Sequence, residues 1–528
     1  KVPSAADQYI LAIDLGTSGP KVALVSMRGE VVAGAFEETP LLLFPNGGAE
    51  QRPDDWWNAV VKAARKVIGQ NLVPVESIVA LSCTSQWSCT VAVGRDGRPL
   101  MNAINWMDTR GEPYVRQITG GPLKIQGYGI DKLMAWVRLT GGIPTHSGKD
   151  SIAHILYLKH ERPEIYGETH KFLEPKDYLN LRLTGKYAAS YDSIILHWLT
   201  DNRDIANVYY HDRLLALAGV DRDKFPDLKH AGDVLGPLTP EAAAELGLRE
   251  SVQVVAGTTD AQSAAIGSGA VRDYETHLYL GTSSWISCHV PFKKTDLFNN
   301  MASLPSAIPG RYYIANEQEC AGVCLTFLRD NLLYAKDELG TGAPPSDVYQ
   351  LFDRLAEQAP PGSDRVIFAP WLYGERTPIE DHTVRGGFFN VSLKSARQDL
   401  VRAVFEGVAY NARWLLGGVE QFCNRRLEPL NMIGGGAKSG LWCQIHADVL
   451  NRTIRQVKDP LWANVRGATF LAAVALGTMK FDEISERVEI AKTYQPDPAN
   501  RKIYDELFKE FLNVYKNNKQ MYARLNRV

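Results

Sequence analysis

Residues 9–34 alternate apolar runs with short polar turns, a pattern that predicts a β-meander. Its strands are expected at Tyr9–Asp14, Val22–Ser26 and Val31–Ala33, with Arg28-Gly29 at the middle turn. A second alternating strand pair is expected at Ile78–Cys83 and Thr90–Val93. Sheet structure therefore opens the chain.

Helical patterns follow the meander. Pro53-Asp54-Asp55 opens a helix to about Ile68, because proline suits a first helical turn and acids suit its positive end. Helical segments dominate from about 130 to 220, and Val252–Ala256 is a further apolar strand before a helix that starts near Asp260. Alternating strands and helices predict an α/β fold.

The plan then restarts in the second half of the chain. Strands are expected at 276–281, 284–290 and 430–433, and helices at 321–335, 347–358, 395–423, 440–451 and 465–477. A final amphipathic helix carries an aromatic stripe from Tyr504 to Tyr515, which is typical of a packing face. We place a domain boundary near 268–274.

Composition agrees with a globular protein of two or more domains, since 528 residues exceed one ordinary core. The net charge of −2 gives no reason to expect nucleic acid or a membrane surface as a partner. Seven scattered cysteines suit reduced thiols, and neither a long apolar run nor a signal-peptide pattern is present. A cytoplasmic enzyme is the expectation.

Two similar turns carry the first candidate chemistry. Ile10-Leu-Ala-Ile-Asp14-Leu-Gly16-Thr17-Ser18-Gly19-Pro-Lys21 is echoed by Leu278-Tyr-Leu-Gly281-Thr282-Ser-Ser284. Glycine lets backbone N–H groups and hydroxyls approach anionic oxygens, so the pair suits nucleotide phosphates held between two lobes. Each turn alone could be an ordinary hairpin. Asp14, at the end of an apolar strand, is a candidate partner for hydrated Mg²⁺.

Asp260 has two interpretations. Gly257-Thr-Thr-Asp260-Ala-Gln262 joins a strand to a helix, where aspartate is a favoured N-cap. The carboxyl end of a strand is also where open α/β folds place reactive groups, and phosphoryl transfer needs a carboxylate to deprotonate the attacking hydroxyl. We take Asp260 as the candidate general base.

A glycine run supplies a third candidate. Ile433-Gly434-Gly435-Gly436-Ala437-Lys438 follows an apolar strand and opens a helix, but it has neither Walker A nor Rossmann spacing. Three consecutive glycines indicate close approach of something flat or anionic.

Aromatic and polar side chains suggest a sugar site. Trp106-Met-Asp108-Thr-Arg110 places an aromatic ring, an acid and a guanidinium on one face if extended. An Asp–Arg pair beside a core tryptophan is an equally good interpretation, and Gln86-Trp87 carries the same ambiguity.

Longer motifs resemble the FGGY carbohydrate kinases of the actin/sugar kinase/Hsp70 superfamily, above all the xylulokinase-like members. The resemblance runs from about residue 8 to the final helix. Its motifs are Gly374-Glu-Arg-Thr-Pro378 with Asp381 and Arg385-Gly386, the helix at 399–407, the segment at 434–448, and Gly47-Gly48-Ala-Glu-Gln51 with Pro53, Trp56 and Trp57.

The resemblance implies two actin-like, ribonuclease H-like domains with a catalytic cleft between them: 8–268 for sugar and phosphate, and 269–528 for adenosine. ATP and Mg²⁺ would be required, and a homodimer is possible. Carried over by position, the implied site is Asp14 for the metal; Gly16, Thr17, Ser18, Lys21, Gly281 and Thr282 for phosphates; Gly435, Gly436 and Ala437 for adenosine; Asp260 for catalysis; and Gln86, Trp87, Trp106, Asp108 and Asp260 for sugar.

Departures from the family bear on the substrate. Trp87-Ser88 stands where xylulokinases usually carry Met-His, and Asp260-Ala261 where they carry Asp-Asn; the latter is similar to ribulokinases. Neither pair matches glycerol kinases, and His154 and Tyr157 replace the usual Lys and Trp. The expected reaction is ATP-dependent phosphorylation of a ketopentose, D-xylulose or a ribulose. The alternatives are a kinase of another polyol and a catalytically weak sugar- or nucleotide-sensing protein.

Overall fold

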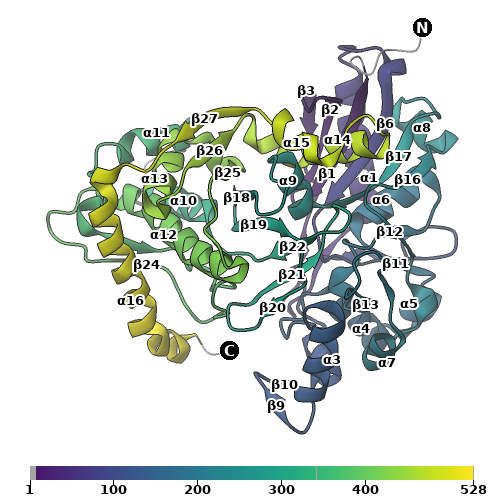
Figure 1. Ribbon diagram of the computed structural model, residues 1–528, viewed down its shortest axis with the longest axis horizontal. Coiled ribbons are helices and arrows are strands. Elements are labelled where there is room, and N and C mark those ends of the chain that lie inside the picture. Colours follow the sequence, from purple (N-terminus) through teal and green to yellow (C-terminus); the bar gives the residue numbers. More distant parts are fainter. Residues whose placement is uncertain (1–7, 341, 527–528) are drawn as a thin grey trace.

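The computed structural model describes residues 8–340 and 342–526, and these form two lobes, each built on a mixed β-sheet. We call residues 8–267 the first lobe and residues 276–526 the second lobe; Figure 1 shows them side by side, the first coloured from purple to teal and the second from teal to yellow. The predicted α/β class is confirmed.

The first lobe contains a six-stranded sheet. In spatial order its strands are β16 (Val234–Pro237), β17 (Gln253–Thr259), β6 (Ile78–Ser85), β1 (Tyr9–Gly16), β2 (Gly19–Ser26) and β3 (Val31–Phe36). The meander β1–β2–β3 is antiparallel as predicted, whereas β6 runs parallel to both β1 and β17. The parallel strands bring the carboxyl ends of β1, β6 and β17 to one edge.

The second lobe repeats this plan in a larger sheet. In spatial order its strands are β20 (Thr295–Asp296), β21 (Met301–Pro305), β22 (Tyr312–Ala315), β19 (Ser284–Val290), β18 (Thr276–Leu280), β25 (Leu430–Ile433), β26 (Ile454–Val457) and β27 (Ile490–Tyr494). The β18–β19 hairpin is antiparallel and β25 lies parallel to β18, as β6 lies parallel to β1. The internal repeat inferred from the two turns is therefore a repeat of sheet topology.

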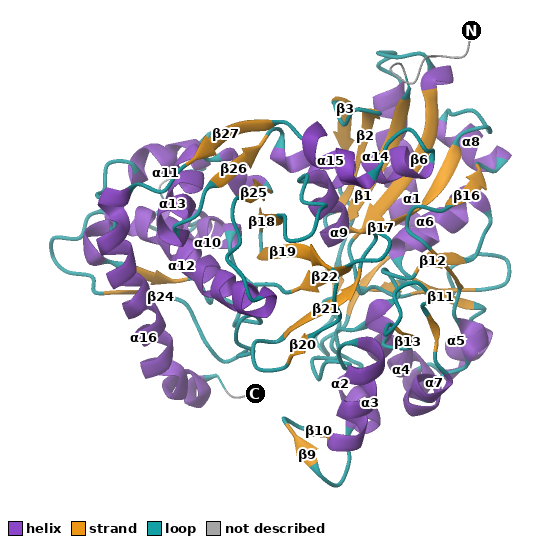
Figure 2. Cartoon of the chain, in the orientation of Figure 1, coloured by secondary structure: helices purple, strands orange, loops and turns teal. Residues whose placement is uncertain are grey.

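Helices cover both sheets (Figure 2). Those of the first lobe are α1 (Pro53–Ile68), α2 (Glu112–Thr119), α3 (Ile130–Thr140), α4 (Ser151–Glu161), α5 (Pro163–Glu168), α6 (Pro175–Thr184), α7 (Asp212–Ala218), α8 (Pro240–Leu246) and α9 (Asp260–Gly267). Those of the second are α10 (Gly322–Phe327), α11 (Val348–Ala356), α12 (Arg397–Cys423), α13 (Gly440–Leu450), α14 (Ala463–Ala475), α15 (Phe481–Arg487) and α16 (Arg501–Leu525). Among the described residues, none of these helices is long and apolar enough to cross a membrane.

Short strands complete the lobes. In the first they are β4 (Leu42–Leu43), β5 (Ala49–Gln51), β7 (Val91–Val93), β8 (Ala103–Ile104), β9 (Lys124–Ile125), β10 (Tyr128–Gly129), β11 (Lys171–Leu173), β12 (Ala188–Ser190), β13 (Thr200–Asp201), β14 (Tyr209–Tyr210) and β15 (Asp227–Lys229); in the second, β23 (Ile367–Ala369) and β24 (Gly387–Phe389). The predicted pairing of the strand at 78–83 with the one at 90–93 is wrong: β6 sits inside the large sheet, and β7 pairs with β11.

Helix α14 joins the lobes. It follows β26 of the second lobe in sequence, yet it packs on α9 and on β1, β2, β6 and β17 of the first lobe; Figure 1 shows it in yellow-green among the purple strands. Two glycines permit the contact. A Cβ on Gly267 would lie 1.7 Å from the Ala463 carbonyl oxygen, and one on Gly467 would lie 1.8 Å from that of Ser263.

We expect Gly467→Ala to destabilise the protein by about 3 kcal/mol, because the added methyl group forces two packed helices apart. Gly417→Ala is the matched control, since no atom lies within 4 Å of its added Cβ on α12. That variant should be neutral or stabilise by about 0.5–1 kcal/mol. Denaturant unfolding of both variants measures the difference. Equal stabilities would contradict the close-contact role of Gly467.

Candidate active site

Asp14 and Asp260 begin the site from neighbouring elements of the first lobe. Asp14 lies near the end of β1 and is 4 % exposed; its described partner is the Lys21 ammonium, with Nζ 3.6 Å from Oδ2. Asp260 is the first residue of α9, directly after β17. The N-cap position belongs to Thr259, so Asp260 is not the cap that one interpretation allowed.

The electrostatics of the site act on Asp260. Desolvation by the surrounding protein is the largest cause that raises its pKa from 3.8 to about 7, and the charges of Asp14 and Glu317 add to the rise. The Ala261 backbone N–H donates to Oδ1 at 2.7 Å and opposes it. A carboxyl group with a pKa near 7 can take up and release a proton at neutral pH.

Glu317, which sequence reasoning missed, comes from the second lobe. It follows β22 and accepts a hydrogen bond from Arg376 Nη1 at 2.6 Å, while Arg376 Nε donates to Glu319 at 2.9 Å. Arg376 lies in the GERTP motif. The carboxylate of Glu375 beside it is buried and accepts from the N–H groups of Glu319 and Arg376. This motif therefore fixes the wall of the second lobe that faces Asp260.

Thr17 lies in a network of buried amides. Its hydroxyl donates to Gln86 Oε1 at 2.8 Å and accepts from Trp106 Nε1 at 2.9 Å. Gln86 Nε2 in turn donates to Gln51 Oε1 at 2.8 Å, and Asn105 Nδ2 donates to both glutamine oxygens. The network brings together Thr17, Gln86 and Trp106, and it orients the first turn through side chains that the sequence had suggested for phosphate and sugar.

Gly16, Ser18 and Lys21 complete this turn at the junction of β1 and β2. Gly16 pairs with Gly19 across the hairpin, and Ser18 is exposed. The Ser18 carbonyl accepts from the Thr39 N–H at 3.0 Å, which ties the turn to the chain beyond β3. The exposed hydroxyl and the Lys21 ammonium remain available to an anion.

Asp108 and Trp87 are engaged with protein. Arg110 Nε lies 2.9 and 3.2 Å from the two Asp108 oxygens, and the Ala49 N–H donates to Oδ2 at 2.9 Å. Trp87 is half-buried and its Nε1 donates to the Ser193 carbonyl at 2.9 Å. The structure contains the Asp–Arg pair that one interpretation of residues 106–110 predicts. The presence of this pair does not decide whether the segment binds a sugar.

The second turn is packed against a helix start. The carbonyls of Gly281 and Thr282 accept from the N–H groups of Gly322 and Ala321 at 2.7 and 2.9 Å. These bonds hold the β18–β19 turn against α10.

Packing explains most of the glycine run at 434–436. A Cβ on Gly434 would lie 2.6 Å from the Leu280 carbonyl oxygen, and one on Gly436 would lie 2.5 Å from the Leu280 side chain. Gly435 is exposed, with no atom nearer than 3.7 Å to its added Cβ, and Ala437 is buried. Two of the three glycines therefore serve the packing of the turn on β18, and Gly435 has open space for a ligand.

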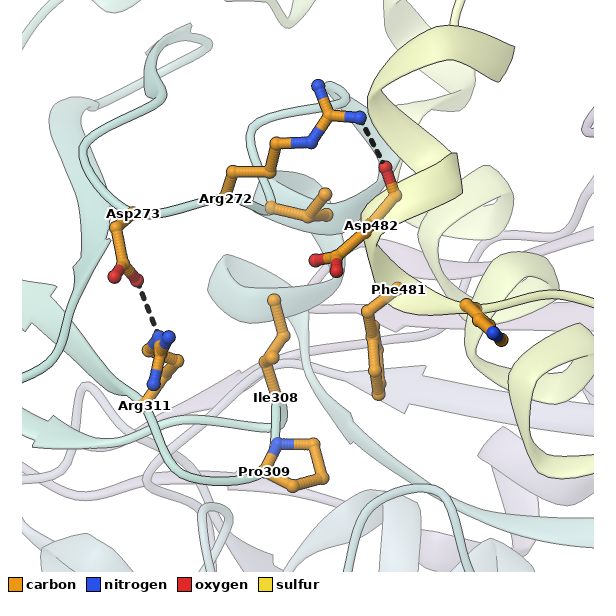
Figure 3. Close-up of a pocket in the computed structure, with 9 residues that line it drawn as sticks. Arg272, Asp273, Ile308, Pro309, Arg311, Phe481 and Asp482 are labelled. Carbon is orange, nitrogen blue, oxygen red and sulfur yellow. Dashed lines mark hydrogen bonds and ion pairs between the residues drawn. The ribbon is translucent and has the colours of Figure 1, made fainter.

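A surface hollow elsewhere shares no residue with this site (Figure 3). Its guanidinium groups are already paired: Arg272 donates to the Asp482 carbonyl at 2.6 Å, and Arg311 to Asp273 at 2.5 Å. The residues that line it are Val271, Arg272, Asp273, Ile308, Pro309, Arg311, Lys480, Phe481 and Asp482.

The repeated lobes, with a carboxylate pair beside two glycine-hydroxyl turns, define a kinase of the actin-like class. Comparison with known proteins assigns the family. The model of the FGGY family of carbohydrate kinases, N-terminal domain, matches residues 9–267, and that of its C-terminal domain matches residues 277–476. The chain belongs to the FGGY family of carbohydrate kinases, and it is a sugar kinase.

Individual relatives share the whole length. A xylulose kinase of Bacillus subtilis (strain 168) is 28% identical over 98% of this chain and 99% of its own. A gluconokinase of the same organism is 25% identical over 98% and 97%. The crystal structure of a ligand-bound xylulose kinase from Lactobacillus acidophilus is 25% identical, has a TM-score of 0.85, and covers 98% of this chain and 100% of that one.

We expect Asp260→Asn to stabilise the protein more at pH 8 than at pH 5. The folded-state pKa is raised, so the folded protein retains a proton that the unfolded chain releases, and stability falls as pH rises from about 4 to about 7. In the Asp260→Asn variant a neutral amide replaces the carboxyl group, so this loss of stability with rising pH does not occur. Thermal unfolding should show a gain of a few degrees at pH 8 and a smaller one at pH 5.

The control for this experiment is Asp482→Asn, on the exposed start of α15. It should shift the melting temperature equally at both pH values. A shift for Asp260→Asn that does not depend on pH would contradict the raised pKa.

Proposed function

We propose that this carbohydrate kinase transfers the γ-phosphoryl group of ATP to a hydroxyl of a ketopentose, D-xylulose or a ribulose, in the cytoplasm. The observation that carries the proposal is Asp260, a partly exposed carboxyl group with a pKa near 7 beside a second carboxylate and two phosphate-type turns. Similarity to xylulose kinases supports the ketopentose, and the gluconokinase similarity makes an aldonate the main competitor.

In the proposed reaction Asp260 removes the proton of the sugar hydroxyl, and the oxygen attacks the γ-phosphorus in line with the leaving ADP. The bond to the β-phosphate oxygen breaks, so the products are a sugar phosphate, ADP and a proton on Asp260. Gln86, Trp87, Trp106 and Asp108 would surround the sugar. The amide network and the Asp108–Arg110 pair give this part of the site a fixed shape.

The nucleotide would lie between the lobes. Gly16, Thr17, Ser18 and Lys21 would hold phosphates from the first lobe, and Gly281 and Thr282 from the second. The Thr17 hydroxyl is already bonded twice, so its contribution would come from the backbone N–H. Gly435, Gly436 and Ala437 would border the adenosine, with Gly435 the open position. The boundary between the sugar and adenosine domains is placed at 268–269.

Asp14 fits a magnesium ion bound with the nucleotide. Its buried carboxylate accepts no hydrogen bond from the described residues, and Mg²⁺ uses one or two carboxylates together with water and substrate phosphates. When bound, the ion would neutralise part of the negative charge of the phosphates. Asp14 and Asp260 repel each other without a cation, which favours cation binding.

The test is a coupled ADP-release assay with MgATP against D-xylulose, ribuloses, gluconate, pentitols, tetritols and glycerol. We expect turnover with a ketopentose and a loss of at least about 1,000-fold in Asp260→Asn, because the general base is removed. Asp482→Asn should keep wild-type turnover. For the wild type, kcat/KM should rise with pH through about 7, since the ionised carboxylate is the base.

Each outcome decides between alternatives. Near-normal turnover of Asp260→Asn would exclude this base. Turnover only on gluconate or another polyol would retain the kinase and exclude the ketopentose. ATP binding without transfer to any acceptor would favour the sensing protein. Sedimentation of the purified chain would test the possible homodimer.

A further inference from the structure

Tyr279 lies directly over the second glycine-hydroxyl turn, the one at Gly281 and Thr282 between β18 and β19. It occupies the position before the last residue of β18, two residues ahead of Gly281. A Cβ added to Gly281 would be 2.4 Å from the Tyr279 hydroxyl oxygen and 2.5 Å from the nearest ring carbon. The tyrosine ring thus fills the space that a side chain at Gly281 would take, and its hydroxyl lies at the turn.

Neighbouring rings hold Tyr279 in this position. Trp285, its cross-strand partner on β19, stacks on it with ring centres 3.9 Å apart and planes 10° from parallel. Trp285 Nε1 donates a hydrogen bond to His277 Nε2 at 2.9 Å, which fixes the indole in turn. A ring supported in this way presents its hydroxyl with little loss of conformational entropy on ligand binding.

The Tyr279 hydroxyl has no hydrogen-bond partner among the described residues, although the side chain is half-buried. Two enclosed tyrosines have one: Tyr191 donates to the Ser306 carbonyl at 3.2 Å, and Tyr210 to the Pro226 carbonyl at 3.0 Å, whereas the buried Tyr410 hydroxyl has none in the described part of the chain. Buried tyrosine hydroxyls usually find a partner. The Tyr279 hydroxyl is unpaired among the described residues and is not fully buried, so it is open to a ligand that binds at the turn.

The surroundings determine what kind of ligand that is. Burial is the main cause that raises the pKa of Tyr279, and the charges of Asp260, Asp14 and Glu317 add to it. The phenol therefore remains neutral and can donate a hydrogen bond. The charge of Asp260, the proposed general base, acts on the Tyr279 hydroxyl, and this hydroxyl lies over the turn at Gly281. In an in-line transfer, the γ-phosphoryl group lies between those two points.

We propose that the Tyr279 hydroxyl donates a hydrogen bond to a γ-phosphoryl oxygen of bound ATP, with Trp285 and His277 as positioning residues. This inference rests on the proposed function for the identity of the nucleotide. The transferred group would then receive a hydrogen bond from a side chain of strand β18, in addition to those from the two glycine turns.

The test compares Tyr279→Phe with the wild type by calorimetric titration with MgADP and with a magnesium complex of a non-hydrolysable ATP analogue. We expect the variant to bind the analogue about tenfold more weakly, because a hydrogen bond to a charged group is lost. MgADP, which lacks the γ-phosphate, should bind both proteins equally. In the sugar assay, kcat should fall about tenfold or more.

Two controls separate this role from a structural one. Tyr279→Phe keeps the stacked ring and removes a hydroxyl without a protein partner, so its melting temperature should match the wild type. Tyr349→Phe, on the partly exposed face of α11 in the same lobe, should bind both nucleotides as the wild type does.

Equal binding of the analogue by Tyr279→Phe and the wild type would overturn the proposal. So would an equal loss for MgADP and the analogue, or a change confined to the sugar KM. If the wild type binds the analogue but phosphorylates no acceptor, the proposed function fails, and the nucleotide comparison still decides the role of Tyr279. A wild type that binds neither nucleotide would overturn both.

Discussion

The close contact between α9 and α14 is the constraint on which the active site depends. The two helices meet at Gly267 and Gly467, where no side chain fits between the backbones. Asp260 is the first residue of α9, and α14 also packs on β1, which carries Asp14. One helix from late in the chain therefore sets the position of both carboxylates. A shift of α14 would therefore act on Asp14 and Asp260 together.

A second feature of the site is its concentration of negative charge. Asp14 and Glu317, one from each lobe, add to the rise of the pKa of Asp260, because both oppose its ionisation. Burial first, and then the same charges, raise the pKa of the Tyr279 phenol. Lys21 and Arg376 balance part of the charge from the rim.

Much of the fold could be predicted because local patterns determine it. The helix expected from Pro53 to Ile68 and the strand expected from Leu430 to Ile433 have those limits in the structure. The partner of a strand is set by residues far away in the chain. For this reason the sequence pattern predicts that β6 pairs with β7, whereas in the structure β6 lies beside β1.

Candidate site residues could be predicted where position along the chain carried the signal. A carboxylate at the end of an apolar strand drew attention to Asp14, and one at a strand–helix junction drew attention to Asp260. Tyr279 and Glu317 became candidates only when the structure placed them near Asp260. An aromatic residue in a strand is typical of a core, and an acid in a loop is typical of a surface. Three glycines in a row suggested a ligand, whereas two of them accommodate Leu280.

The late position of α14 also affects how the protein is made. Its Phe470 and Leu471 share a buried cluster with Ile10 and Ala80 of the first sheet. A ribosome releases the whole first lobe long before it releases residues 463–475. Until then, one apolar face of that sheet lacks the cover of α14, and the nascent chain presents it to chaperones or to other chains. The first half of this kinase completes its core only when the second half has nearly all emerged.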